Sequence, residues 1–152
     1  MARIDSRAVL RHFAGNAIVT LLAAWWVIFG IEFFIEGITP GPQTTSAVSQ
    51  FPVYISIGVG AFYSLGGAII LWGLYTRNRD LTGVFQWRKA GYTLAAFAGG
   101  IYAFYTLKYV PLELVAPSFG LMHMTLGVAG LGTTMCSEGS ERRKRTTPQG
   151  EL

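Results

Sequence analysis

Residues 51–75 read FPVYISIGVGAFYSLGGAIILWGLY and contain no charged side chain. The uncharged run is longer still, because no Asp, Glu, Lys or Arg occurs between Gly37 and Tyr75. A helix needs roughly 20 apolar residues to cross the ~30 Å hydrocarbon core of a bilayer. Residues 51–75 meet that requirement, and we predict a membrane-spanning helix there.

Three further apolar stretches have a similar length, at about 13–35, 90–110 and 118–136. Turn-forming residues at 38–43 and charged residues at 76–80 separate the first three of the four stretches. Backbone groups in lipid must hydrogen-bond within their own segment, and no stretch alternates polar and apolar residues as a membrane strand does. The predicted fold is therefore all-α, an integral membrane four-helix bundle over residues 13–136.

The basic residues predict how such a bundle is oriented. Three lie in an N-terminal arm at 1–12, four in the connection at 76–89 and four in a polar tail at 137–152. Four crossings place these segments on one face, and Lys108 is the single base expected on the other. Because Lys and Arg favour the cytoplasmic side, both termini are predicted to be cytoplasmic, in the cell (inner or plasma) membrane. We expect the tail to be mobile.

The composition of the 152 residues agrees with a membrane protein. Hydrophobic residues make up 51% and charged residues 13%, against roughly 25% charged in a soluble domain. A single cysteine, Cys136, excludes a disulfide framework and cysteine-rich metal sites. The net charge of +4 comes from bases beside apolar segments, which indicates contact with the lipid bilayer rather than with nucleic acid.

No catalytic motif is present. The sequence has no G-x-S-x-G, no H-E-x-x-H and no phosphate-binding glycine loop. His12 and His123 are expected near opposite faces of the membrane, so a haem held by both is not expected. We predict no catalytic residue, no metal and no cofactor.

Small residues recur at four-residue spacing in two of the predicted spans. They are Ser56, Gly60 and Ser64 in the second span and Ala95, Gly99 and Ala103 in the third. Such stripes let two helix backbones approach closely in lipid. We expect them to pack helices within the bundle, with contact to another subunit as the alternative.

Two adjacent tryptophans, Trp25 and Trp26, fall near the middle of the first span, away from the interfaces where tryptophan is usual. Neighbouring side chains on a helix point about 100° apart, so both can hardly face one neighbouring helix. Both are candidates for contact with lipid or a partner, and one of them can instead pack inside the bundle.

Ionisable residues gather near the predicted outer end of the spans. Folding can bring together Glu32, Glu36, Lys108, Glu113 and His123. Three interpretations stay open: a structural Glu32–Lys108 pair, a proton or cation relay through Glu32 and His123, and a metal site of two carboxylates and one imidazole.

These features predict a small, non-catalytic, polytopic membrane protein. The first hypothesis is an accessory or assembly subunit of a larger membrane complex, acting through intramembrane helix contacts with another membrane protein or with further copies of itself. One alternative is a self-associating, holin-like pore former. The other is a small ion- or proton-coupled carrier that uses Glu32.

Overall fold

The computed structural model of the chain describes residues 6–38, 51–75, 81–109 and 115–146, which form four α-helices and no strand. They are α1 (Ser6–Ile38), α2 (Val53–Tyr75), α3 (Leu81–Tyr109) and α4 (Val115–Thr146). Side chains are described over 16–38, 51–75, 85–109 and 117–143. The predicted all-α, four-helix architecture is confirmed for these residues.

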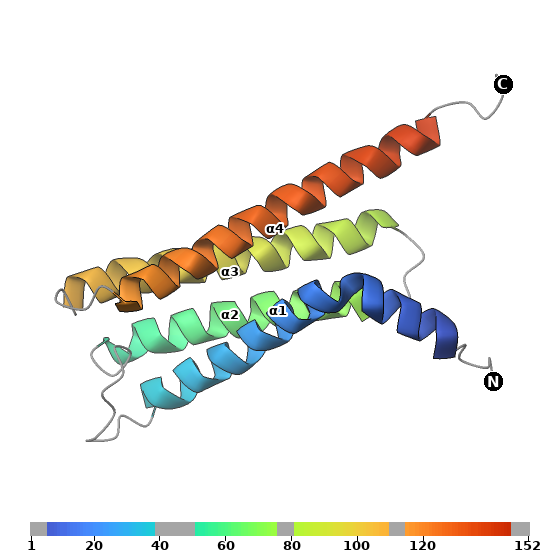
Figure 1. Cartoon of the computed structure of the whole chain (residues 1–152). Helices are drawn as coiled ribbons and strands as arrows, with labels where there is room; N and C mark the ends of the chain where they lie inside the picture. Colours follow the sequence, from blue (N-terminus) through green and yellow to red (C-terminus); the bar gives the residue numbers. More distant parts are fainter. Residues whose placement is uncertain (1–5, 39–50, 76–80, 110–114, 147–152) are drawn as a thin grey trace, which may run out of the picture.

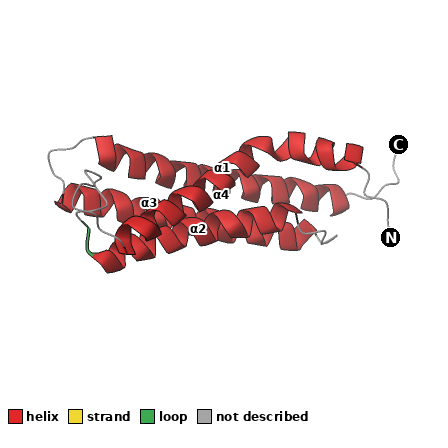
Figure 2. Ribbon diagram, turned by 90° about the horizontal axis from the view of Figure 1, so that it is seen from below, coloured by secondary structure: helices red, strands yellow, loops and turns green. Residues whose placement is uncertain are grey.

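The four helices run alternately up and down. The start of α1 and the end of α4 lie at one end of the bundle, together with the end of α2 and the start of α3 (Figures 1 and 2). Helices that follow one another in the chain make the main contacts, α1 with α2, α2 with α3, and α3 with α4. Helices α1 and α4 diverge toward the end that carries the termini (Figure 1).

Three helices extend beyond the predicted spans. Helix α1 begins at Ser6, within the predicted N-terminal arm, and ends at Ile38. Helix α3 begins at Leu81, so the connection expected to lead into residue 90 is already helical. Helix α4 continues to Thr146, so residues 137–146 of the predicted tail are helical. An ion pair between Glu138 and Arg142, one turn apart, supports the helix in this segment.

Two of the helices are long and apolar enough to cross a bilayer: Asn16–Ile38 within α1 and Val53–Tyr75, the whole of α2. Each has 23 residues, which at ~1.5 Å per residue gives about 34 Å. Among the described residues α3 and α4 do not meet this criterion. Their apolar stretches are diluted by glycine, threonine and tyrosine, which contribute little to hydropathy.

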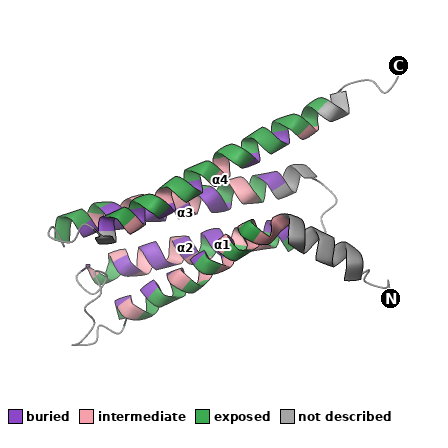
Figure 3. Cartoon of the chain, viewed as in Figure 1, coloured by how far each residue is buried: buried purple, intermediate pink, exposed green. Residues whose placement is uncertain are grey.

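The core is built largely from aromatic and small residues. Trp26, Tyr63, Ala95 and Ala98 have no exposed surface, and Tyr92 and Tyr102 are buried beside them. Large apolar side chains also cover the outside of all four helices, among them Ile18, Leu65, Phe104 and Val128. Buried residues, in purple, and exposed residues, in green, alternate along the helices in Figure 3, as expected where one side of a helix packs and the other does not.

Candidate functional site

The centre of the bundle holds a buried polar pair, Tyr63 from α2 and His123 from α4. The Tyr63 hydroxyl lies 3.1 Å from His123 Nδ1 and forms a hydrogen bond whose direction follows the imidazole tautomer. Tyr63 is fully buried and His123 is 1% exposed. This bond joins α2 to α4, two helices that do not follow one another in the chain.

Aromatic rings enclose this pair. The ring centroids of Phe119 and Phe29 lie 4.4 Å and 5.1 Å from that of His123, and Phe29 lies 5.4 Å from Tyr63. Phe33 extends the cluster from Tyr63 to Tyr102 of α3. Edge-to-face contacts dominate, the arrangement that aromatic pairs prefer. The cluster thus connects all four helices around one hydrogen bond.

The structure does not bring the described members of the predicted outer polar cluster together around His123. His123 points inward, whereas Glu32 and Lys108 are exposed and Glu36 is half-buried. Among the described residues no ion pair joins Glu32 to Lys108, and the Lys108 ammonium lies 5.3 Å from the Tyr109 ring centroid. Glu113 lies outside the described residues.

Helix periodicity explains the separation. Trp26 and Phe33 are buried seven residues apart on one face of α1. Because each residue turns the helix by about 100°, Glu32 lies about 100° or more around the helix from both of them and is directed away from that face. On α3, Thr106 is buried, and Lys108 lies two residues later, about 200° around the helix. A shared depth in the bilayer does not place side chains on facing sides of their helices.

The same rotation separates the two adjacent tryptophans. Trp25 is 50% exposed and stacks on Phe29 at 6.3 Å between ring centroids. Trp26 is fully buried and meets Tyr92 edge-on at 5.9 Å. Trp25 therefore remains a candidate for contact with lipid or a partner, whereas Trp26 is a core residue and that expectation is wrong for it.

Close approach of α1 and α2 centres on Gly30 and Gly60. A Cβ atom at Gly60 would lie 2.6 Å from the Gly30 carbonyl oxygen and 2.9 Å from the Phe34 nitrogen. Ser56 lies at the same interface, where a Cβ at Gly37 would be 2.9 Å from the Ser56 Cβ. Ser64 donates a hydrogen bond to the Val27 carbonyl oxygen at 3.4 Å. The stripe Ser56–Gly60–Ser64 thus faces α1.

The stripe on α3 is divided between two neighbouring helices. A Cβ at Gly66 of α2 would lie 3.3 Å from the Ala95 nitrogen. A Cβ at Gly99 would lie 2.6 Å from the Met124 nitrogen, and one at Gly120 would lie 2.7 Å from the Ala103 nitrogen. Ala95 therefore packs on α2, whereas Gly99 and Ala103 pack on α4.

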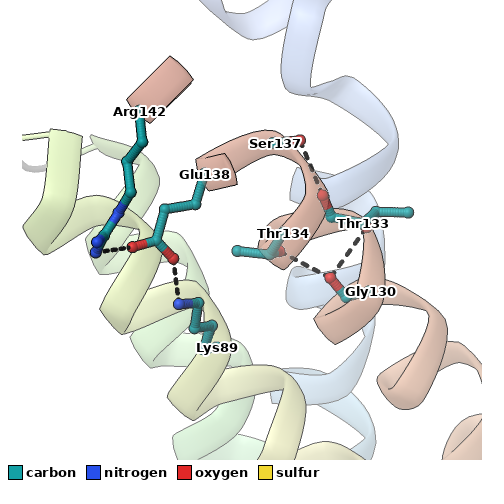
Figure 4. A network of polar contacts seen from close by, with 7 residues as sticks. All are labelled: Lys89, Gly130, Thr133, Thr134, Ser137, Glu138 and Arg142. Atoms are coloured by element: carbon teal, nitrogen blue, oxygen red, sulfur yellow. Dashed lines mark hydrogen bonds and ion pairs between the residues drawn. The ribbon is translucent and has the colours of Figure 1, made fainter. Parts of the chain in front are cut away.

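A second polar cluster lies between α3 and α4, near the end that carries the termini. Lys89 of α3 donates to Glu138 Oε2, and Arg142 donates to Glu138 Oε1 at 2.7 Å (Figure 4). Hydroxyl groups of Thr133, Thr134 and Ser137 donate to backbone carbonyl oxygens of α4 in the preceding turn (Figure 4). The ion pair between Lys89 and Glu138 thus joins α3 to α4.

These contacts hold Glu138 in its charged form. The hydrogen bond from Lys89, followed by that from Arg142, lowers the pKa of the Glu138 carboxyl below its ordinary value. A lowered pKa in the folded state means that the pairing stabilises the fold above the ordinary glutamate range. The stabilisation is lost as the pH falls through the lowered pKa.

An open hollow of about 300 Å³ adjoins the cluster. It is lined by Lys89, Met135, Glu138, Gly139 and Arg142. Within the described ranges, no three His, Cys, Asp or Glu side chains gather as a metal site would require. Two polar clusters are thus candidates for a functional site: the buried Tyr63–His123 pair and the charged cluster around Glu138.

Several of these residues were not singled out in the sequence. Gly30 and Gly37 follow Ala23 at seven-residue intervals, a signal that indicates one face of α1. Tyr63 lies in an uncharged span, and a buried tyrosine hydroxyl usually requires a hydrogen-bond partner. Lys89 and Glu138 are 49 residues apart in sequence, and no local pattern connects them.

No protein-family model matches the chain, and the searches of curated proteins and of solved structures likewise found no match.

Proposed function

We propose that the chain is an integral membrane protein whose four helices all cross the bilayer, and that it is an accessory or assembly subunit of a larger membrane complex. The observation that carries the membrane assignment is the distribution of polarity in the bundle. Buried positions include Ser56, Thr106, His123 and Thr134, whereas the outside exposes more than twenty large apolar side chains. Soluble proteins rarely expose extended apolar surface on every side.

The polar groups inside also suit a lipid environment. The Thr106 and Thr134 hydroxyls donate to the carbonyl oxygens of Tyr102 and Gly130, both at 2.7 Å. His123 and Tyr63 bond to each other. Partners of this kind keep polar side chains satisfied where no water is available.

The packing of the interior favours a subunit over a carrier or pore. Aromatic rings from all four helices fill the centre, and Glu32, the residue that a carrier would use, faces outward. A subunit instead acts through its outer surface. Trp25 supports this role, because it is half exposed at mid-span, and tryptophan is enriched among residues that dominate binding energies.

The proposed topology predicts a labelling pattern in intact cells. In a Cys136→Ser background, a cysteine at Thr45 is expected to react with a membrane-impermeant maleimide added outside. A cysteine at Thr82 is expected to react only after the cells are opened. The physical reason is the placement of eleven of the twelve bases on the cytoplasmic side. The reverse pattern would overturn the orientation, and equal labelling of both positions would overturn membrane insertion.

The subunit role predicts that a tagged chain, purified from native membranes in mild detergent, co-elutes with larger membrane proteins at fixed stoichiometry. Trp25→Ala is expected to reduce this co-elution at least tenfold, since loss of a central aromatic contact costs about 2 kcal/mol or more. The chain should stay in carbonate-washed membranes.

Trp72→Ala is the matched control, because Trp72 is 62% exposed and lies near the predicted inner interface. It should leave co-elution unchanged. Recovery of the chain alone as a homo-oligomer would contradict the subunit role and favour a pore former. If both tryptophan variants reduced co-elution equally, Trp25 would not make a specific contact with the partner.

A further inference from the structure

We propose that the hollow between α3 and α4 binds the phosphate of an anionic phospholipid headgroup from the cytoplasmic leaflet. The inference rests on the proposed membrane topology, which places this end of the bundle at the inner surface. Basic pockets between membrane helices on that side are suited to anionic headgroups.

The cluster carries a net positive charge in a fixed geometry. Lys89 and Arg142 come from different helices, and both pair with Glu138 (Figure 4). All three residues line the hollow. These three side chains, two cations and one carboxylate, carry a net charge of +1. An ammonium has three N–H donors and a guanidinium five, so a phosphate oxygen can join the same cations without displacing the carboxylate.

The lining changes from apolar to charged along α4, as a lipid does from acyl chain to headgroup. Met135, which is 57% exposed, lies toward the middle of the bundle, and Glu138 and Arg142 follow one and two turns later. Trp87, exposed two residues before Lys89, marks the depth at which tryptophan meets the bilayer interface. A phosphate beside Lys89 would therefore leave its acyl chains alongside Met135.

Gly139 keeps the hollow open. A Cβ atom at this position would meet no atom within 4 Å, although the residue lines the hollow. A larger side chain there would occupy the space while leaving every charge in place. A substitution at Gly139 therefore tests whether binding needs the open space of the hollow, without changing its charge.

The test measures binding of phosphatidylglycerol and of zwitterionic phosphatidylcholine to the full chain in mild detergent, by native mass spectrometry. The wild-type chain is expected to prefer phosphatidylglycerol. Lys89→Gln with Arg142→Gln should weaken that preference about thirtyfold, roughly fivefold per charge. Arg88→Gln with Arg143→Gln removes two charges from the same two helices, at described residues that do not line the hollow, and should change the preference less than twofold.

Two further variants separate binding from folding. Gly139→Leu should abolish the preference, whereas Gly132→Leu, seven residues earlier in equally open space, should preserve it. Glu138→Gln removes the competing carboxylate and should strengthen phosphatidylglycerol binding about fivefold. If Glu138→Gln instead weakens binding as much as the Lys89/Arg142 pair does, the cluster is a structural clamp only.

Other outcomes would also overturn the inference. Equal losses with both pairs of basic substitutions would assign the preference to diffuse charge at this end of α3 and α4. Displacement of the lipid by millimolar inorganic phosphate would assign the hollow to a free anion. A chain that stays in carbonate-washed membranes without any lipid preference refutes this inference alone, whereas a chain released by carbonate refutes the proposed membrane role.

Discussion

Gly60→Leu is expected to separate α1 from α2 and to destabilise the bundle by about 3 kcal/mol or more. The reason is that backbone, not flexible side chain, surrounds the position: a Cβ atom would lie 2.6 Å from the Gly30 oxygen and 2.9 Å from the Phe34 nitrogen. Relief requires movement of a whole helix, which would also draw Phe29 and Phe33 away from the core cluster. The fraction of protein that stays monodisperse in detergent after heating measures the effect.

Gly58→Leu is the matched control. Gly58 lies on the same helix two residues earlier, and a Cβ atom there would meet no atom within 4 Å. The same substitution should change stability by no more than about 0.5 kcal/mol, as is usual for surface positions. Equal behaviour of the two variants would show that α1 and α2 do not approach closely at Gly60.

The helix contacts were the more predictable part of the fold. Apolar length and breaks in the sequence are local signals, and they indicated all four helices. Small residues at regular spacing likewise indicated surfaces of close approach. Which helix each surface meets depends on rotation about the helix axis, so the pattern alone did not show that Ala95 faces α2 while Gly99 faces α4.

The polar contacts were less predictable, for a physical reason. Residues at one depth can point in any direction around their helices, and Glu32 and Lys108 point away from the core that His123 enters. The pairing of Lys89 with Glu138 depends on how far α3 and α4 extend as helices. The polarity of residues 137–146 alone does not indicate that they continue α4 as a helix.

His123→Ala is expected to destabilise the bundle by about 3 kcal/mol, in the range found when a large buried ring is truncated. The imidazole contacts Phe29, Tyr63 and Phe119, which come from α1, α2 and α4. Its removal leaves a void among these rings and takes away the partner of the Tyr63 hydroxyl. Heating in detergent, followed by circular dichroism and size-exclusion chromatography, measures the loss.

Met122→Ala is the control, because Met122 precedes His123 and is 46% exposed. It should cost less than about 1 kcal/mol. If the two alanine variants were equally stable, His123 would not be a core residue.

Tyr63→Phe separates the hydrogen bond from the packing, since it removes one oxygen and keeps the ring. It should cost about 1 kcal/mol in the wild-type background, within the range of interhelical hydrogen bonds in membranes and buried pairs in water. In the His123→Ala background the same change should cost almost nothing, because the partner is already gone. Equal costs in both backgrounds would mean that the Tyr63 hydroxyl stabilises the fold through another group, and that α2 and α4 are held together by ring packing alone.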